Sequence, residues 1–275
     1  MRHLSSVLSA GVIAAAISIA PALARDPAVS VTNLKLTAQG GTADDEGAWL
    51  GVGALTLPVG PAWGVQAEAG IFGVDDDTAY GFAGHIFKRD PDSYLAGLFA
   101  AYAGEDEFDL QATRVGGEVE FYMDRVTLLL KAGYQFSDDL DDTAFGEAEL
   151  HWYTTDNFVL RGGASFDEEN ILGHVGAEWQ LGISALPGLA LRADAVFGDE
   201  DYDSVVGGIT YYFGSDASLK DRHRKQDPDS ALFDLFQTVE RERANACPPV
   251  NTQINAFKFG PQQQSACTPP PPPLD

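Results

Sequence analysis

Basic residues and cysteines are scarce in this chain of 275 residues. Lys and Arg number 17 against 41 Asp and Glu, so the formal net charge is −24. Because nucleic-acid phosphates attract basic surfaces, a nucleic acid is a poor partner for such a chain. The two cysteines, Cys247 and Cys267, both lie near the C-terminus. The sequence has no Cys/His spacing of the zinc-binding kind, and we expect no metal site.

Long apolar runs are missing beyond the N-terminus. Residues 4–20 are mostly apolar, follow a short basic start and precede Ala22-Leu23-Ala24, a small-residue cleavage site. This pattern predicts a secretory signal peptide over residues 1–24, and Pro21 disfavours the alternative, a membrane-anchoring helix. The longest later run, near residues 126–130, is far shorter than the ~20 residues of a membrane-spanning helix. Any membrane crossing by the mature chain must therefore use β-strands.

Apolar and polar residues alternate through most of the mature chain, without sustained helical spacing. Alternation with a period of two predicts β-strands, and segments of about 9–11 residues suit strands that cross a membrane at a tilt. We predict twelve strands, at residues 31–40, 47–58, 62–73, 79–88, 93–103, 110–122, 126–135, 144–153, 158–166, 171–181, 189–197 and 204–213.

The connections between these strands alternate between two kinds. Odd-numbered connections are acidic, whereas even-numbered ones are tight-turn sequences rich in Pro, Gly, Asn and Asp. This sorting predicts an antiparallel up-and-down barrel over residues 30–214, because the Greek-key crossings of a soluble β-sandwich would scramble it. We expect the acidic rim to face outside the cell; it includes Asp75, Asp76, Asp77, Asp138, Asp139, Asp199 and Glu200. Calcium binding is an alternative use of these acids, but EF-hand spacing is absent and solvated loops explain them more simply.

Several predicted strands have one apolar face and one face that carries charges, as at residues 110–122, 144–153, 171–181 and 189–197. Aromatic residues near strand ends favour a lipid-facing band with interfacial girdles; they are Trp63, Tyr94, Tyr122, Trp152 and Trp179. The presumed inward set is Lys35, Glu68, His85, Arg114, Glu118, Glu120, Lys131, Glu147, Glu149, His151, Arg161, His174, Glu178, Arg192 and Asp194. These groups either line a water-filled pore, with a weak preference for cations, or form a closed salt-bridge network.

Enzymatic signals are weak in this sequence. Ser165 and His174 fall on neighbouring predicted strands and on one face, as a nucleophile and base would. No orienting acid or oxyanion donor stands at a recognisable spacing, and no glycine-rich phosphate loop is present. We therefore expect no catalytic residues and no cofactor, and a lipid-modifying enzyme is the weakest hypothesis.

The last predicted strand carries a moderately specific motif. Gly208 is followed by Tyr211 three positions later and by Phe213 two positions after that. This resembles the terminal strand that the outer-membrane assembly machinery recognises, although Val206 stands where a polar residue is preferred and residues 214–275 follow the closing aromatic. The chain accordingly resembles porin-like outer-membrane β-barrel proteins of Gram-negative bacteria. That resemblance implies an outer-membrane location, with outer-membrane lipids and the barrel-assembly machinery as partners.

Residues 215–275 read as a separate periplasmic tail, because they begin after an even number of strands. An amphipathic helix is predicted near residues 229–244, followed by a Pro/Gln-rich segment. In an oxidising compartment Cys247 and Cys267 are expected to form a disulfide. The tail's basic cluster and apolar stripe suggest peptidoglycan or a periplasmic protein as a partner.

The leading functional hypothesis is a narrow passive channel for small hydrophilic solutes with weak cation preference. The alternative is a closed structural or interaction barrel of the cell envelope without transport. The sequence does not separate these two hypotheses, because an inward charged face serves both.

Overall fold

A computed structural model describes residues 26–44, 46–75, 77–105, 110–137, 142–167, 171–198 and 203–246, with side chains as far as Arg241. The strands are β1 (Asn33–Ala43), β2 (Glu46–Pro58), β3 (Trp63–Val74), β4 (Asp77–Asp90), β5 (Tyr94–Glu105), β6 (Leu110–Met123), β7 (Val126–Phe136), β8 (Thr143–Thr155), β9 (Phe158–Phe166), β10 (Ile171–Gln180), β11 (Leu189–Gly198) and β12 (Asp203–Tyr212). Two helices follow, α1 (Leu219–Lys225) and α2 (Leu232–Ala246).

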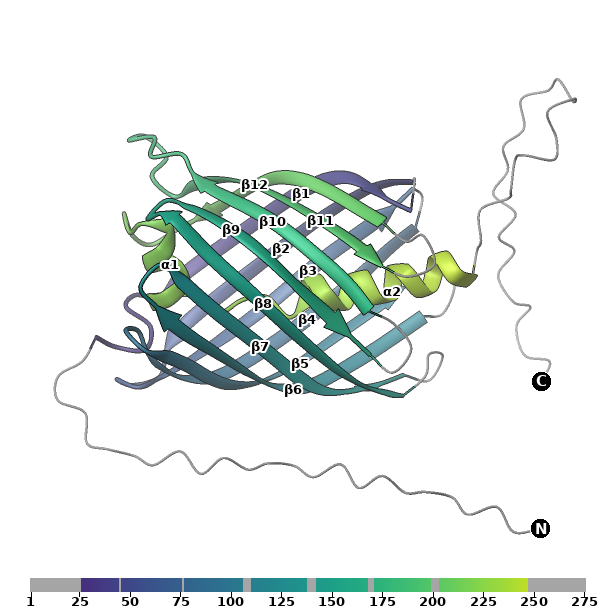
Figure 1. Cartoon of the computed structure of the whole chain (residues 1–275), viewed down its shortest axis with the longest axis horizontal. Helices are drawn as coiled ribbons and strands as arrows, with labels where there is room; N and C mark the ends of the chain where they lie inside the picture. Colours follow the sequence, from purple (N-terminus) through teal and green to yellow (C-terminus); the bar gives the residue numbers. More distant parts are fainter. Residues whose placement is uncertain are drawn as a thin grey trace, which may run out of the picture.

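The twelve strands form one closed antiparallel barrel in which every strand pairs with its sequence neighbours and β1 pairs with β12 (Figure 1). The predicted strand number and the up-and-down fold are confirmed. Tight turns join neighbouring strands: Asp44 and Asp75 have φ angles of 49° and 48° at the starts of two short connections. Aspartate tolerates this left-handed region better than most residues, which suits it to short hairpins.

The two openings of the barrel differ in the connections that surround them. We call the opening with residues 59–62, 91–93, 124–125, 156–157 and 181–188 the turn end. The opposite opening, surrounded by the odd-numbered connections, is the acidic end. The chain reaches β1 and leaves β12 at the turn end, because an even number of strands brings it back to its starting side.

The outer surface of the barrel is apolar along its strands. Leu98, Ile171 and Phe82 are 64%, 62% and 56% exposed, far more than expected for large apolar side chains on a water-facing surface. Trp63, Trp152 and Trp179 are exposed on this face as well. Tyr122 does not belong to the outer aromatic set, because its side chain is buried on the inner face.

The seam between β1 and β12 uses the predicted motif residues. A Cβ atom on Gly208 would collide with the backbone of Ala38 and Gln39 on β1, so glycine permits the close approach of these strands. The rings of Tyr211 and Phe213 contact each other edge to face, with centroids 4.6 Å apart. The seam therefore closes through a small residue and an adjacent aromatic pair.

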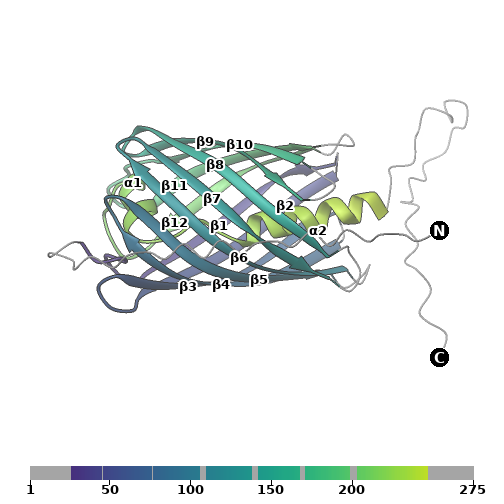
Figure 2. The same cartoon turned by 60° about the horizontal axis from the view of Figure 1, so that its bottom comes forward.

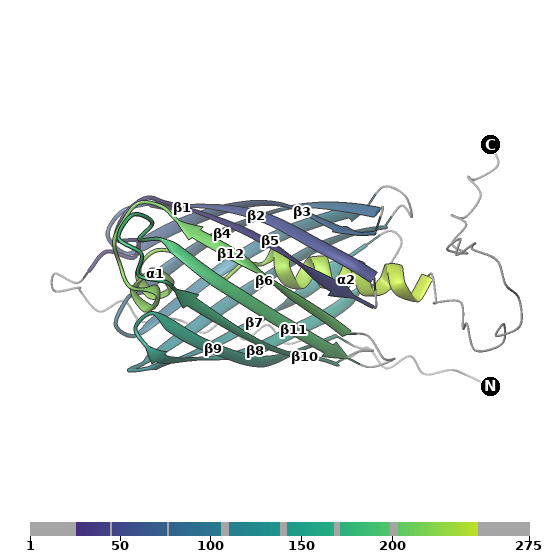
Figure 3. The ribbon, with the colours of Figure 1, turned by 90° about the horizontal axis from the view of Figure 1, so that it is seen from above.

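Residues 215–246 do not form a separate unit outside the barrel. The predicted helix exists as α2, but it lies inside the lumen, and α1 sits in the turn end (Figures 1 and 2). Viewed from above, α2 runs along the barrel and reaches past the strand ends at the acidic end (Figure 3). Neither of the described helices is long and apolar enough to cross a membrane by itself. The expectation of an external tail was wrong for residues 215–246, because their apolar and charged side chains find partners on the inner wall.

Candidate functional site

The candidate site is the lumen together with residues 215–246, which we call the plug segment. At the turn end, α1 is fastened to two hairpin turns. Its N-cap Ser218 accepts a hydrogen bond from the backbone of Asp221. The backbone N–H of Lys220 donates to the carbonyl oxygen of Asp156 at 2.9 Å, and the Lys220 side chain pairs with the same residue at 3.1 Å. Arg224 donates to the carbonyl oxygen of Asp124 at 2.8 Å, so α1 bridges across the opening.

His223 joins α1 to the strands through a buried chain of hydrogen bonds. Its Nδ1 lies 3.0 Å from the Tyr153 hydroxyl and its Nε2 lies 3.0 Å from the Tyr212 hydroxyl. Tyr212 donates its proton to Glu178 at 2.7 Å, so it accepts from Nε2–H, and Nδ1 accepts from Tyr153. This network fits a neutral imidazole. Burial lowers the pKa of His223 well below its ordinary value, and the nearby positive groups of His151, Lys35 and Arg161 act in the same direction.

Lys131 on β7 is the central cation of the lumen. Its Nζ lies 3.0 Å from the Asp229 carboxylate, 3.4 Å from that of Asp234 and 3.3 Å from that of Glu147. It also donates to the carbonyl oxygen of Ser230 at 2.9 Å. Three of these four partners belong to the plug segment. One wall lysine therefore holds both the segment before α2 and the first turn of α2.

A second wall network meets the plug segment at Ser230. His85 lies between two carboxylates, with its Nε2 2.9 Å from Glu68 and its Nδ1 3.0 Å from Glu118. The hydroxyl of Ser230 donates to the other oxygen of Glu68 at 2.5 Å. Closer to the turn end, Lys35 pairs with Asp227 at 3.6 Å. The plug segment thus completes charged networks that begin on the wall.

One face of α2 packs against an apolar part of the wall. Leu232, Leu235, Phe236 and Val239 are buried in a cluster with inward side chains of β2, β4, β5, β6 and β8. The Phe72 and Phe236 rings stack with centroids 5.9 Å apart. Since burying a large apolar side chain contributes about 1.5–3 kcal/mol, this face stabilises docking substantially.

Two wall glycines make room for this face of α2. A Cβ atom on Gly70 would lie 3.1 Å from the Phe236 ring, and one on Gly81 would lie 3.0 Å from both Phe236 and Leu232. Larger residues at these positions would have to displace the helix or the neighbouring strands. The inner wall is therefore shaped to receive α2.

Polar contacts hold α2 near the acidic end. Arg114 on β6 donates to the Thr238 hydroxyl at 2.8 Å. Arg241 pairs with Asp167, which follows β9, at 3.0 Å. The guanidinium of Arg192 lies 4.5 Å from the centre of the Phe233 ring. The exit of the plug segment is anchored as well as its beginning.

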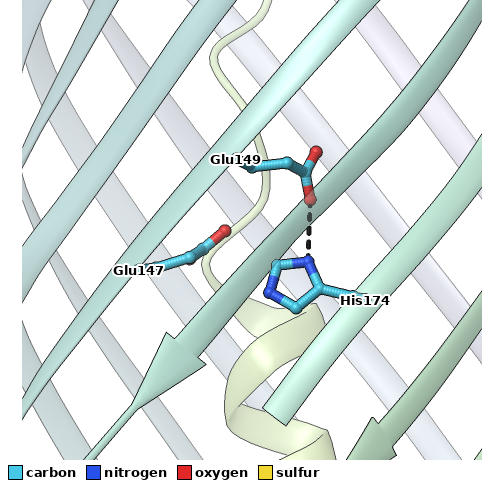
Figure 4. Close-up of side chains that lie close together, drawn as sticks. All are labelled: Glu147, Glu149 and His174. Carbon is cyan, nitrogen blue, oxygen red and sulfur yellow. Dashed lines mark hydrogen bonds and ion pairs between the residues drawn. The ribbon is translucent and has the colours of Figure 1, made fainter. Parts of the chain in front are cut away.

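A crevice open to solvent remains between α2 and the wall, lined by charged side chains and by Leu50, Phe72 and Phe236 of the apolar cluster. Glu147, Glu149 and His174 line it and lie close together on β8 and β10 (Figure 4). Glu149 accepts from His174 Nδ1 at 3.0 Å, and its other oxygen contacts His151. The carboxylate oxygens of Glu147 and Glu149 and the ring nitrogen of His174 that could bind a metal lie within 4.8 Å of one another.

A divalent cation is a conceivable occupant of this cluster, because carboxylate and imidazole groups are its usual ligands. Here the carboxylates already have partners: Lys131 pairs with Glu147, and two histidines contact Glu149. A bound cation would compete with these groups. The cluster is therefore better explained as part of the charged network that surrounds the plug segment.

Ser165 on β9 and His174 on β10 lie two register positions apart on paired strands, as the sequence predicts. Their side chains line two different cavities, Ser165 beside Arg114 and Asp167 and His174 beside Glu149. His174 Nδ1 is engaged by Glu149. The geometry therefore does not favour a Ser165–His174 catalytic pair.

Comparisons with known proteins support the barrel architecture. No protein-family model matches the chain, and no curated protein does. The KdgM porin structure matches with a TM-score of 0.52 and 6% identity, covering 66% of this chain and 99% of KdgM. The COG4313 outer membrane channel from Pseudomonas putida F1 matches with a TM-score of 0.48 and 9% identity over 71% of this chain and 99% of that one. Omp33 from Acinetobacter baumannii matches with a TM-score of 0.46 and 14% identity, over 66% of this chain and 99% of Omp33.

The chain has a porin-like outer-membrane barrel fold. At these identities the likeness shows the fold alone, and the chemistry of the lumen must be argued from this chain's own residues.

In this porin-like barrel the fifteen presumed inward residues lie on the inner face, buried or half-buried, while their strand neighbours point outward. They form local networks rather than one. Besides the groups described above, Asp194 pairs with Arg161 at 2.5 Å and with Arg192 at 2.7 Å. Glu120 is buried close to Tyr122 and Arg89, near the turn end.

Several predicted positions lie outside the described residues of the porin-like barrel. They are the signal peptide, Asp76, Asp138, Asp139, Asp199, Glu200, Cys247 and Cys267. Asp75 and Asp77 are described and lie at the acidic end, at the connection between β3 and β4. The disulfide and the full acidic rim therefore stay predictions.

Sequence reasoning missed the plug, although a signal for it exists. Leu50 and Val52 on β2, and Phe99 and Ala101 on β5, point inward, yet their outward neighbours are also largely apolar. A water-filled lumen of a porin-like barrel needs polar inward residues along these strands. Two strands that are apolar on both faces, together with the amphipathic helix at residues 229–244, indicate that the helix packs inside.

Proposed function

We propose that this protein is an outer-membrane channel that its own C-terminal segment holds closed. The observation that carries the proposal is Lys131, which binds Asp229, Asp234 and the carbonyl of Ser230 on the plug segment and Glu147 on the wall. A pathway opens if the plug segment leaves. Its walls would then present charged side chains of both signs, suited to small hydrophilic solutes with a weak cation preference.

The outer-membrane location is supported by the exposed apolar band and by the closed edge of the sheet. In a bilayer every backbone polar group must find a partner within the protein, and a closed barrel meets that need. We place the turn end in the periplasm and the acidic end outside, because both the start of β1 and the end of β12 lie at the turn end. Gly208, Tyr211 and Phe213 would engage the barrel-assembly machinery during insertion.

A permanently closed envelope barrel is the second candidate function. The apolar cluster between α2 and the wall favours it, because such a surface is stable only when it stays covered. In that case the protein would serve as an anchor or interaction module without conducting solutes.

Planar-bilayer conductance separates the two functions. We expect low conductance from the full-length protein and a higher open fraction from Lys131→Met, because this change leaves the buried Glu147 and the half-buried Asp229 and Asp234 without their shared cation. Removing one partner of a buried ion pair typically costs about 3–5 kcal/mol. Lys88→Met, a change at a half-exposed lysine near the turn end, is the matched control. A variant lacking residues 216–275 gives the upper limit of the conductance. If neither that variant nor Lys131→Met conducts, the closed structural barrel is favoured.

A further inference from the structure

The direction of the plug segment has a consequence for the chain that follows it. Its contacts with the barrel advance steadily along the lumen. Lys220 meets Asp156 in a turn-end hairpin, and Arg241 meets Asp167 next to an acidic connection. Between them, contacts with Lys35, Glu68, Lys131 and Arg114 follow one another toward the acidic end, each from a different strand.

The length of the plug segment matches a complete crossing. α2 has 15 residues and is about 22 Å long at ~1.5 Å per residue. Residues 226–231 precede it without helical structure and can cover up to about 20 Å at ~3.3 Å per residue. Together they exceed the roughly 30 Å of a bilayer's hydrocarbon core.

The end of α2 lies beyond the wall that holds it. Val239 and Glu240 border a small cavity with Asp77 and Glu105, at the strand ends next to the acidic connections. The helix continues from Arg241 to Ala246, about 7 Å further at ~1.5 Å per residue. Figures 1 and 3 show this last part of α2 past the strand ends.

We propose that the C-terminal segment is a thread through the barrel, which carries the chain after Ala246 to the acidic side of the membrane. The protein then displays residues 247–275 on the side opposite to the one where β12 ends. With the acidic end outside, this displayed peptide is open to extracellular macromolecules. This topology does not depend on conduction, so it goes beyond the proposed channel function.

The composition of the displayed peptide is compatible with that position. Residues 247–275 contain one Lys and one Asp, and are rich in Pro and Gln. A peptide whose side chains carry no net charge is not repelled by a rim of carboxylates, whereas a strongly acidic one would be. The basic cluster of Lys220, Arg222, Arg224 and Lys225 stays at the turn end, in α1.

The native cysteines make the test direct, because Cys247 and Cys267 are the only two in the chain and both follow Ala246. Intact cells producing the full-length protein are treated with a mild reductant and then with a membrane-impermeant maleimide. Two reference proteins carry Cys247→Ser and Cys267→Ser with one new cysteine each, Asp76→Cys at the acidic end or Asp92→Cys in the exposed turn after β4.

We expect the native cysteines to be labelled in the same preparation as the Asp76→Cys protein, and the Asp92→Cys protein to be labelled only after the outer membrane is permeabilised. If the native cysteines and Asp76→Cys are both labelled only after permeabilisation, the C-terminal segment still passes through the barrel. In that case the acidic end faces the periplasm and not the outside of the cell. The proposal is wrong if the native cysteines are labelled under the same condition, intact or permeabilised cells, as Asp92→Cys and not under the condition that labels Asp76→Cys. Conductance enters none of these outcomes, so a failed channel hypothesis and a failed thread are distinguishable.

Discussion

At the scale of single residues, the plug segment is held by buried polar groups whose charge state matters. His223 is the clearest case, because both of its ring nitrogens have tyrosine partners and its side chain is only 18% exposed. A protonated imidazole would need Tyr153 to accept rather than donate at Nδ1. Glu178 lies 3.6 Å from Nε2. The nearby carboxylate of Asp229 raises the pKa of His223 but does not offset the effect of burial.

Acidification should therefore loosen α1. Because the pKa of His223 is lowered on docking, its contribution is complete above the ordinary value of about 6.5 and is lost as the pH falls below it. The docked state should lose up to about 1.4 kcal/mol per pH unit in this range. Limited trypsin cleavage at α1 in the detergent-solubilised protein, compared between pH 7.5 and pH 5.5, measures the effect. His223→Gln should remove most of this difference; an equal pH response in that variant would contradict the assignment.

At the scale of elements, the decisive fit is between α2 and the inner faces of β3 and β4. The helix rests where the wall carries glycine, so the packing is sensitive to added volume. Overpacking a filled site typically costs about 1–3 kcal/mol, which is a factor of about 5–150 in the docking equilibrium. Such a change should act on the plug segment more than on the strand ladder.

Gly70→Leu should increase proteolysis of α2 in the folded protein by about that factor, because the new side chain would crowd Phe236 as well as Val52 and the Gly51 carbonyl of the wall. Gly84→Leu is the matched control: it lies on the outer face of β4, where a Cβ atom meets only a backbone oxygen at 3.9 Å. Both variants should keep the heat-sensitive gel mobility of a folded barrel. Equal proteolysis of the two variants would show that α2 does not depend on this contact.

At the scale of elements, the sequence predicts which strands and helices form but not where the C-terminal helix packs. Period-two alternation and the sorted connections predicted the twelve strands and the inward set, because both depend only on neighbouring residues. The helix at Leu232–Ala246 was also foreseen. Its position was not, because an amphipathic stripe requires an apolar partner without indicating which one. Likewise the pairing of Lys131 with Asp229 joins residues far apart in the chain, and no spacing rule predicts that contact.

At the scale of the whole molecule, charge is distributed along the barrel axis. The outer band is apolar, α1 brings a basic cluster to the turn end, and the sequence predicts an acidic rim at the other opening. Charges on an open rim act over about 10 Å at 0.1 M salt, so in the proposed channel they would influence which ions reach the lumen. The rim rather than the mixed lumen wall should dominate ion selectivity.

Changing Asp75, Asp76, Asp77, Asp138 and Asp139 to Asn together should lower the cation preference of the conducting Lys131→Met protein. The change in reversal potential should be largest at low salt and should fade near 1 M, where the Debye length is about 3 Å. Reversal potentials across a salt gradient provide the measurement. An unchanged cation preference would assign selectivity to the lumen wall instead.

Because β1 pairs with β12, the barrel is a closed ring, and the plug segment of the same chain passes through that ring. A tail that passes through a ring made by its own chain forms a lasso. It can leave only by sliding backward through the turn end, drawing residues 247–275 through the lumen, or by separation of the seam. A folded domain or a tightly bound partner on the far side would act as a stopper. Retention of the tail would then no longer depend on the free energy of docking, because the barrel would have to open before the two parts could separate.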